Sequence, residues 1–188
     1  MSDAQYIQSY LHETKMIADQ IEQGEIVKMV SILRTIRENN GRLFILGVGG
    51  SAGNASHAVN DFRKIGKIEC YAPTDNVSEL TARTNDEGWN TTFSEWLKVS
   101  RINEKDAVMV LSVGGSSQNT SLNIKEAIDI AKEHNSKIMG IVSRDGGYTK
   151  KKADACVLIP VVNDSRITPH AEGWQGVIWH LVVNALDA

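Results

Sequence analysis

The chain has 188 residues, of which 41% are hydrophobic and 23% are charged. This length supports one folded core and is short for two complete domains, so we expect a single domain over residues 1–188. The formal net charge is -3, and both signs are mixed along the chain without a basic block. Such a charge pattern argues against nucleic acid or an anionic membrane surface as a partner.

The sequence carries no sign of export or of a membrane span. Its first residues, MSDAQYIQSY, lack a basic segment followed by an apolar stretch, and no run of about 18 apolar residues occurs. Cys70 and Cys156 each lie in or beside a short apolar run and have no CxxC spacing, which is typical of buried thiols in a reducing compartment. We therefore expect a cytoplasmic protein that does not associate with membranes.

Residues 1–40 predict two leading helices. Apolar side chains recur there at helical spacing on both sides of Gly24. They are Ile7, Tyr10, Leu11, Ile17 and Ile21 before the glycine, and Ile26, Met29, Val30, Leu33 and Ile36 after it. The period then changes at residues 42–47 (RLFILG), where a nearly continuous apolar run predicts a strand that is buried on both faces.

The same strand pattern returns three more times, with helical patterns such as residues 122–134 between the runs. The clear runs are residues 107–112, 137–142 and 155–160, and a weaker run at residues 68–72 suggests a fifth strand. Residues 172–186 read as a closing helix. Alternating strands and helices predict an α/β fold, a three-layer αβα sandwich with a parallel, doubly wound, flavodoxin-like sheet. Ligands of such sheets bind beyond the carboxyl ends of the strands.

Two glycine- and serine-rich loops follow predicted strands and precede predicted helices. The first is residues 47–51 (GVGGS), and the second is residues 112–119 (SVGGSSQN). Backbone amides, hydroxyl groups and a helix N-terminus can together bind an anion, most often phosphate. The first loop is not a dinucleotide fingerprint, because Ala52 stands where GxGxxG needs glycine, and no Lys-Ser or Lys-Thr pair follows as in a P-loop.

Two pairs of polar residues are candidates for chemistry. His57 and Asp61 are four residues apart, so they lie on one helical face, and Glu172 and His180 are two helical turns apart on the closing helix. Two carboxylates and two imidazoles could bind a divalent ion, act as acid and base, or do both. The sequence alone does not establish whether the two helices meet.

Five motifs resemble those of the sugar isomerase (SIS) family, and within it the phosphoheptose isomerases. They are GVGGSAGNASH (residues 47–57), TNDEGW (84–89), SVGGSSQN (112–119), GIVSRDGG (140–147) and the pair Trp179-His180 in the closing helix. The resemblance covers nearly the whole chain. It implies an aldose–ketose isomerase that converts sedoheptulose 7-phosphate to D-glycero-D-manno-heptose 7-phosphate through an enediol, for surface-polysaccharide heptose.

The resemblance also implies the site residues and the assembly. It makes Asp61 the base and His180 its acid partner, and it assigns a zinc ion to His57, Asp61, Glu172 and His180. The implied substrate-binding residues are Ser51, Asn54, Asn85, Asp86, Ser112, Ser116, Ser117 and Asn119. Family members are homotetramers with sites shared between subunits, so residues 1–40 are expected to pack both on their own domain and on partner subunits.

Three departures from the family pattern leave alternatives open. The family usually has glutamate where this chain has Asp61, glutamine where it has Glu172, and hydroxyl residues where it has Val113 and Gly114. Glu172 could have taken over part of the catalytic or ligand role of the shorter Asp61, and the altered loop could serve another sugar phosphate. A further alternative is a non-catalytic relative that binds a protein such as the bacterial replication initiator, although those relatives tend to lose the acid–base residues that this chain retains.

Overall fold

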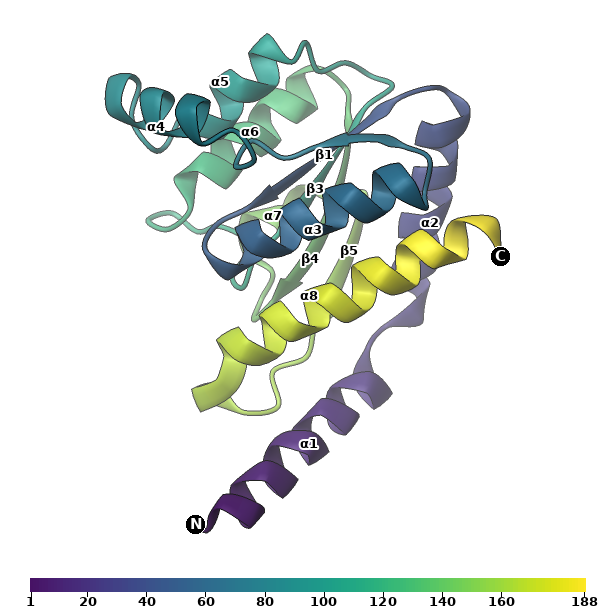
Figure 1. The fold of residues 1–188 in the computed structure, drawn as a ribbon, viewed down its shortest axis with the longest axis vertical. Coiled ribbons are helices and arrows are strands. Elements are labelled where there is room, and N and C mark those ends of the chain that lie inside the picture. Colours follow the sequence, from purple (N-terminus) through teal and green to yellow (C-terminus); the bar gives the residue numbers. More distant parts are fainter.

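Five parallel strands form the central sheet in the order β2-β1-β3-β4-β5 (Figure 1), in a computed structural model that describes residues 1–188. The strands are β1 (Arg42–Gly47), β2 (Glu69–Tyr71), β3 (Ala107–Leu111), β4 (Lys137–Ser143) and β5 (Ala155–Ile159). This is the flavodoxin-like order, which reverses direction between β1 and β3. The predicted fold class and all five predicted strands are confirmed.

The strands end level at the edge where the order reverses. Gly47, the last residue of β1, is paired with Leu111, the last residue of β3. The loops that follow these two strands therefore leave the sheet side by side. This register brings together the two glycine-rich loops found in the sequence.

Helices cover both faces of the sheet (Figure 1), because successive strand residues point to opposite sides. Leu43 and Ile45 join a core cluster of 28 buried residues beneath α2 (Gln23–Glu38), α3 (Gly50–Lys64) and α8 (Ile167–Asn184). Phe44 and Leu46 join a cluster of 12 beneath α5 (Thr92–Val99) and α6 (Leu122–Glu133). The larger cluster fixes α3 and α8 next to each other. The remaining helices are α1 (Asp3–Gln20), α4 (Val77–Asp86), α7 (Gly147–Lys152) and two 3-10 turns, Asp164–Arg166 and Ala185–Asp187.

Two helices differ from the sequence prediction. Helix α8 begins at Ile167, five residues before the predicted start, because Pro169 lies in its first turn, where a missing N–H breaks no helical hydrogen bond. Helix α4 buries none of its residues, so it has no apolar stripe that the sequence analysis could detect.

Helix α1 extends away from the sheet and contacts the rest of the chain along one side (Figure 1). Its buried residues are Ile17 and Glu13, whereas Tyr6, Ile7 and Leu11 are exposed. Glu13 accepts hydrogen bonds from Asn163, Arg166 and His170, just before and within α8. Burial alone would raise the pKa of Glu13, but these hydrogen bonds, with the Arg166 charge, lower it to about 2.

Both cysteines are free and buried, as the sequence predicted. Burial raises the pKa of the Cys156 thiol to about 11, and it raises that of Cys70 as well, so neither is a reactive thiolate at neutral pH. No helix of the structure is both long and apolar enough to cross a membrane.

Candidate functional site

A polar cavity of about 370 Å³ lies beyond the carboxyl ends of the central strands. Its lining comes from the loops after β1, β3 and β4 and from the start of α8, and most of the lining residues carry hydroxyl groups. They are Val48, Ser51, Ser112, Val113, Gly114, Ser116, Ser117, Thr120, Ser121, Arg144, Asp145 and Thr168. The cavity thus occupies the position that the strand order predicts for a ligand.

Three helices begin at this cavity. Ser51 is in the first turn of α3, Ser121 precedes the first residue of α6, and Thr168 is the second residue of α8. Helix N-termini carry partial positive charge and free N–H groups, so they favour an anion. The charged side chains of the lining, Arg144 and Asp145, are both exposed.

Two buried serines of the cavity keep their hydroxyl protons free for a ligand. Ser51 Oγ accepts a hydrogen bond of 3.0 Å from Gln175 Nε2, and Ser112 Oγ accepts one of 3.1 Å from the Gly115 N–H. Each hydroxyl already serves as an acceptor, so its own proton can be donated to an anion. Ser117 Oγ likewise accepts from the Asn119 N–H, at 3.4 Å.

Ser116 and Asn119 have other roles in the second loop. Ser116 Oγ donates to the carbonyl oxygens of Thr120 and Ser121, so this hydroxyl closes its own loop. The Asn119 side chain is exposed and does not line the cavity. Gly115 has a φ of +66°, and a Cβ atom there would lie 2.0 Å from the Gly146 carbonyl oxygen, so only glycine fits where the loops after β3 and β4 touch.

A second cluster lies on α3 and α8, farther along both helices. One ligand atom from each of His57, Asp61 and His180 lies within 4.8 Å of the others. Asp61 Oδ2 is 3.4 Å from His180 Nε2 and 3.8 Å from His57 Nε2. The Asp61 side chain is 11% exposed, whereas those of His180 and His57 are 48% and 59% exposed. The structure therefore brings together three of the residues that the sequence singled out, which we call the His57–Asp61–His180 triad.

The donor atoms of the triad suit a cation. His180 Nδ1 lies 2.6 Å from the Gly176 carbonyl oxygen, which can only accept, so Nδ1 carries a hydrogen and the Nε2 of a neutral ring presents its lone pair to Asp61. A lone pair facing a carboxylate is unfavourable unless a proton or a metal ion lies between them. Ligand atoms of a tetrahedral zinc ion are roughly 3.4 Å apart, close to the two distances measured here.

Glu172 does not lie with the triad in the same chain. Its carboxylate packs on Gly50 at the start of α3, where a Cβ atom would lie 2.5 Å from Glu172 Oε2. Eight residues separate Glu172 from His180 on α8, which corresponds to about 12 Å along the helix. One ion therefore cannot be bound by both residues of a single chain.

The remaining predicted sugar-binding residues are spread over two regions. Asn54 Nδ2 donates to the Glu172 carbonyl oxygen and to Gln175 Oε1, so it links α3 to α8 below the cavity. Asn85 and Asp86 are exposed at the end of α4 and do not line the cavity.

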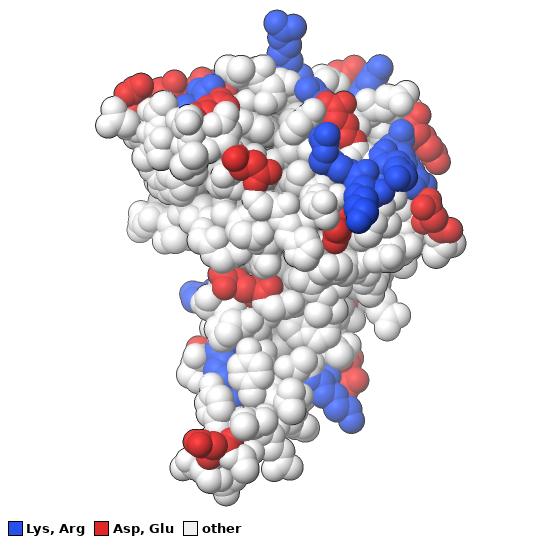
Figure 2. All heavy atoms as spheres, in the orientation of Figure 1, with Lys and Arg blue, Asp and Glu red and all other residues white.

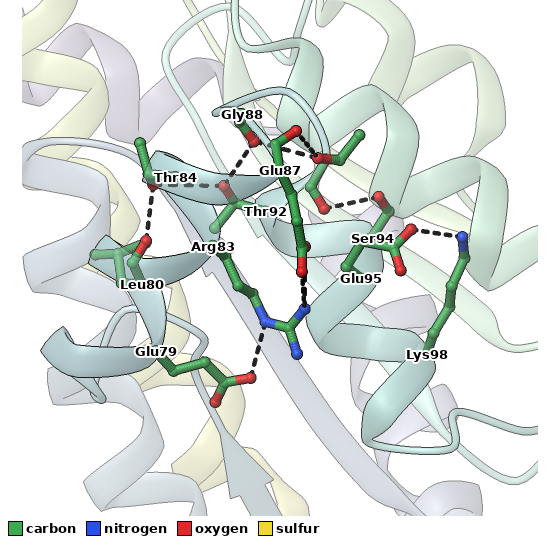
Figure 3. A network of polar contacts seen from close by, with 11 residues as sticks. Glu79, Leu80, Arg83, Thr84, Glu87, Gly88, Thr92, Ser94, Glu95 and Lys98 are labelled. Carbon is green, nitrogen blue, oxygen red and sulfur yellow. Dashed lines mark hydrogen bonds and ion pairs between the residues drawn. The ribbon is translucent and has the colours of Figure 1, made fainter.

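Polar contacts surround the junction of α4 and α5 (Figure 3). Arg83 pairs with Glu79 and Glu87 along α4 itself, and a contact of 3.5 Å between Thr84 Oγ1 and Thr92 Oγ1 joins the two helices. Although α4 buries no residue fully, its Leu80 packs against the smaller core cluster. Asn85 and Asp86 remain exposed at the end of α4.

Sequence reasoning missed five cavity residues. Thr120 and Ser121 extend the second loop beyond the predicted residues, and Thr168 lies before the predicted start of the closing helix. Arg144 and Asp145 fall within the quoted motif GIVSRDGG but received no role. The position of Arg144 and Asp145 just after the predicted strand at residues 137–142 was the signal that could have identified them.

Comparisons with known proteins agree with this architecture. The family model described as SIS domain matches residues 5–143. Phosphoheptose isomerase 1 of Campylobacter jejuni is 31% identical over 161 residues, which are 83% of this chain and 84% of that protein. Among solved structures, a phosphoheptose isomerase from Neisseria gonorrhoeae superposes with a TM-score of 0.85 over 98% of this chain and 99% of its own, at 22% identity. A phosphoheptose isomerase from Francisella tularensis superposes with a TM-score of 0.86 over 100% of this chain and 99% of its own, also at 22% identity. Both solved structures therefore share the fold of this chain.

Proposed function

The chain belongs to the SIS domain family, and we propose that it interconverts a ketose phosphate and an aldose phosphate, with sedoheptulose 7-phosphate as substrate and D-glycero-D-manno-heptose 7-phosphate as product. The observation that carries this proposal is that the chain presents both a hydroxyl-lined cavity beyond the carboxyl ends of the strands and an acid–base triad on α3 and α8. A sugar phosphate needs both kinds of site, one for its phosphate and one for the carbons that exchange a proton. We further propose that the reaction takes place in the cytoplasm. Its product would be a precursor of the heptose in surface polysaccharides.

The cavity binds the phosphate group in this proposal. Ser51, Ser112 and Ser117 donate their free hydroxyl protons to the phosphate oxygens, and the starts of α3, α6 and α8 add N–H groups and partial positive charge. Ser116 contributes by fixing the loop that carries Ser112 and Ser117.

The triad moves the protons. A carboxylate removes a proton from the carbon next to the ketose carbonyl, which gives an enediol, and returns a proton to the neighbouring carbon to give the aldose. Asp61 is the candidate base, and His180, 3.4 Å away, exchanges protons with the two oxygens through Nε2, because its Nδ1 is bound to the Gly176 carbonyl oxygen. The same Nε2 cannot hold a proton and a metal ion at once, so the acid role and the ligand role of His180 are alternatives. Glu172 is the alternative base, since it carries the second carboxylate.

We assign a zinc ion to His57, Asp61 and His180. Three protein ligands and one open position are typical of catalytic zinc, which when bound polarises a substrate carbonyl. Glu172 joins these ligands only from a second copy of the chain, because in its own chain it lies about 12 Å along α8 from His180.

We propose a homotetramer in which each active site combines two copies. Along α3, Gly50 and Asp61 are separated by roughly 16 Å, which favours a phosphate cavity from one chain and a triad from another. An apolar groove of about 330 Å³ between α1, α2 and α8 also supports assembly, with Val27, Val177 and Leu181 exposed on it. Figure 2 shows that the middle of this face, over α3 and α8, is mostly uncharged. Light scattering should give four times the chain mass of 20.7 kDa.

One feature of the cavity favours a different sugar phosphate as substrate. Val113 and Gly114 line it without offering hydroxyl groups, at positions where hydroxyl residues would add contacts. A panel of ketose and amino sugar phosphates tests this alternative. Turnover of another member at a higher kcat/KM than sedoheptulose 7-phosphate would reassign the substrate and leave the reaction class standing.

The central experiment is isomerisation of sedoheptulose 7-phosphate by the purified protein, with a chelator or with added zinc. Asp61→Asn and Glu172→Gln identify the base when zinc affinity is measured beside turnover, because loss of a ligand weakens zinc binding whereas loss of the base abolishes turnover with zinc bound. Glu104→Gln is the matched control, since Glu104 is exposed, makes no ion pair and lies outside the cavity and the triad. Absence of turnover under every metal condition, for every substrate in the panel, would contradict the proposed function.

A further inference from the structure

Trp179 lies directly against both histidines of the triad. Its side chain is 1% exposed. The His180 ring stacks on the indole with centroids 3.5 Å apart and an interplanar angle of 27°, and the His57 ring meets it edge to face at 4.7 Å and 70°. One buried aromatic side chain therefore contacts both imidazoles at once.

The two imidazoles need an orienting partner. Their side chains are 48% and 59% exposed, so packing from the solvent side does not fix their χ angles. His180 has one such partner, the Gly176 carbonyl oxygen, whereas the His57 ring has no hydrogen bond in the chain. It contacts Asp61 at 3.8 Å and the half-exposed His180 ring at a centroid distance of 5.3 Å. The indole is thus the main buried restraint on the His57 ring.

The indole N–H provides a separate observation. Trp179 Nε1 is buried and has no hydrogen-bond partner. An unpaired buried donor is unfavourable, and a phenylalanine would fill an apolar core without that cost. A role in packing alone therefore does not explain a tryptophan at this position, whereas its large flat surface can contact two rings that come from different helices.

We propose that Trp179 is a positioning residue that holds His57 and His180 with their Nε2 atoms directed at Asp61, and so preorganises the triad for a divalent metal ion. The proposal rests on the metal-binding role proposed above. It deepens that role by assigning the orientation of the ligands to a residue that itself binds nothing. Neighbours that orient metal ligands typically change metal affinity by about 10- to 100-fold when they are replaced.

The test compares zinc affinity, measured by competition with a chromophoric chelator, among the wild-type protein and three variants. Trp179→Leu removes the flat surface, and Trp179→Phe keeps part of it. Trp96→Leu is the matched control, because Trp96 packs on the core at the opposite face of the sheet, away from the triad and from the apolar groove. We expect Trp179→Leu to lose about 10- to 100-fold in affinity, Trp179→Phe to lose less, and Trp96→Leu to stay at the wild-type value.

A second readout separates orientation from loss of folding. The visible spectrum of bound Co²⁺ reports ligand geometry, so it should change in Trp179→Leu and stay unchanged in Trp96→Leu, with circular dichroism confirming that both fold. If Trp179→Leu does not fold, Trp179→Met keeps more of the buried volume and takes its place. Wild-type affinity and spectrum in the folded variant would overturn the role of Trp179 alone. No zinc or cobalt binding by the wild-type protein would overturn the metal site, and this proposal with it.

Discussion

The cavity and the triad differ in how completely one chain builds them. Ser51 and Ser112 are buried in the cavity, and each accepts a hydrogen bond from within the chain, so the proposed anion site is preformed. In the triad, Asp61 is covered but both imidazoles are about half exposed, and the fourth expected ligand, Glu172, packs on Gly50, about 12 Å along α8 from His180. This difference suggests that binding is a property of the single chain, whereas the chemistry depends on assembly.

The largest effect should come from the triad. His180→Ala removes the Nε2 atom that serves as the proposed acid or as a proposed metal ligand, so kcat should fall by about 10²- to 10⁴-fold. Binding of inorganic phosphate at the cavity, measured by calorimetry, should stay at the wild-type value, because Ser51 and Ser112 are untouched. A parallel loss of phosphate affinity would show that the two regions do not act separately.

The next effect concerns the buried carboxylate of Glu13, which anchors the start of α8 beside the cavity and contributes to the stability of the fold. The pKa of Glu13 is lowered to about 2 from an unfolded value near 4.5, so its ionised form stabilises the fold above pH 4.5, and this contribution is lost as the pH falls from 4.5 towards 2. Glu13→Gln should remove that part of the pH dependence from the melting temperature and lower the melting temperature at pH 7. Since the Glu13 network anchors the start of α8, which carries Thr168, phosphate affinity should also fall.

The Glu13 variant leaves the triad in place. Zinc affinity at pH 7 should therefore match the wild-type value, which is the control for a local effect. A melting temperature that declines below pH 4.5 as steeply as in the wild-type protein would contradict this account of Glu13.

A smaller effect should follow from single hydroxyl groups of the cavity. Ser51→Ala removes one proposed hydrogen bond to the charged phosphate group. Because this bond holds the substrate before and during the reaction, the KM for the sugar phosphate should rise by about 10-fold while kcat changes little. Ser31→Ala on the exposed side of α2 is the matched control. A fall in kcat with unchanged KM would show that Ser51 acts in the catalytic step and not in phosphate binding.

The smallest effect should come from Arg144. This side chain is exposed at the rim of the cavity, so salt screens its attraction for phosphate. Arg144→Gln should raise KM by about threefold at low ionic strength and by less at high salt. An effect that is independent of salt would indicate direct, desolvated contact.

The sequence predicted most of the cavity because the signals there are local. Apolar runs mark the strands, parallel strands end at one edge, and glycine-rich loops follow two of them, so Ser51 and Ser112 could be brought together without coordinates. Thr168 was missed because Pro169 obscured the first turn of α8.

The triad was predicted less completely because it depends on how two helices pack. Spacing placed His57 and Asp61 on one face, but only the contact between α3 and α8 adds His180 and reveals Trp179 beneath them. Spacing alone could have separated Glu172 from His180, because eight helical residues span about 12 Å. The exposure of Asn85 and Asp86 could not be predicted, since α4 buries no residue and so has no apolar stripe in the sequence that orients it.

The most direct test of the shared site is to mix two variants that are each nearly inactive at a substrate concentration far below KM. Asp61→Asn disables the triad, and the double variant Ser51→Ala, Ser112→Ala raises KM by about 100-fold, which lowers turnover at that substrate concentration in proportion. If each site takes its cavity from one chain and its triad from another, dissociation and random reassembly of the two should restore about a quarter of the wild-type activity towards sedoheptulose 7-phosphate. Activity that stays at the level of the two separate variants after subunit exchange has been verified would contradict the shared site.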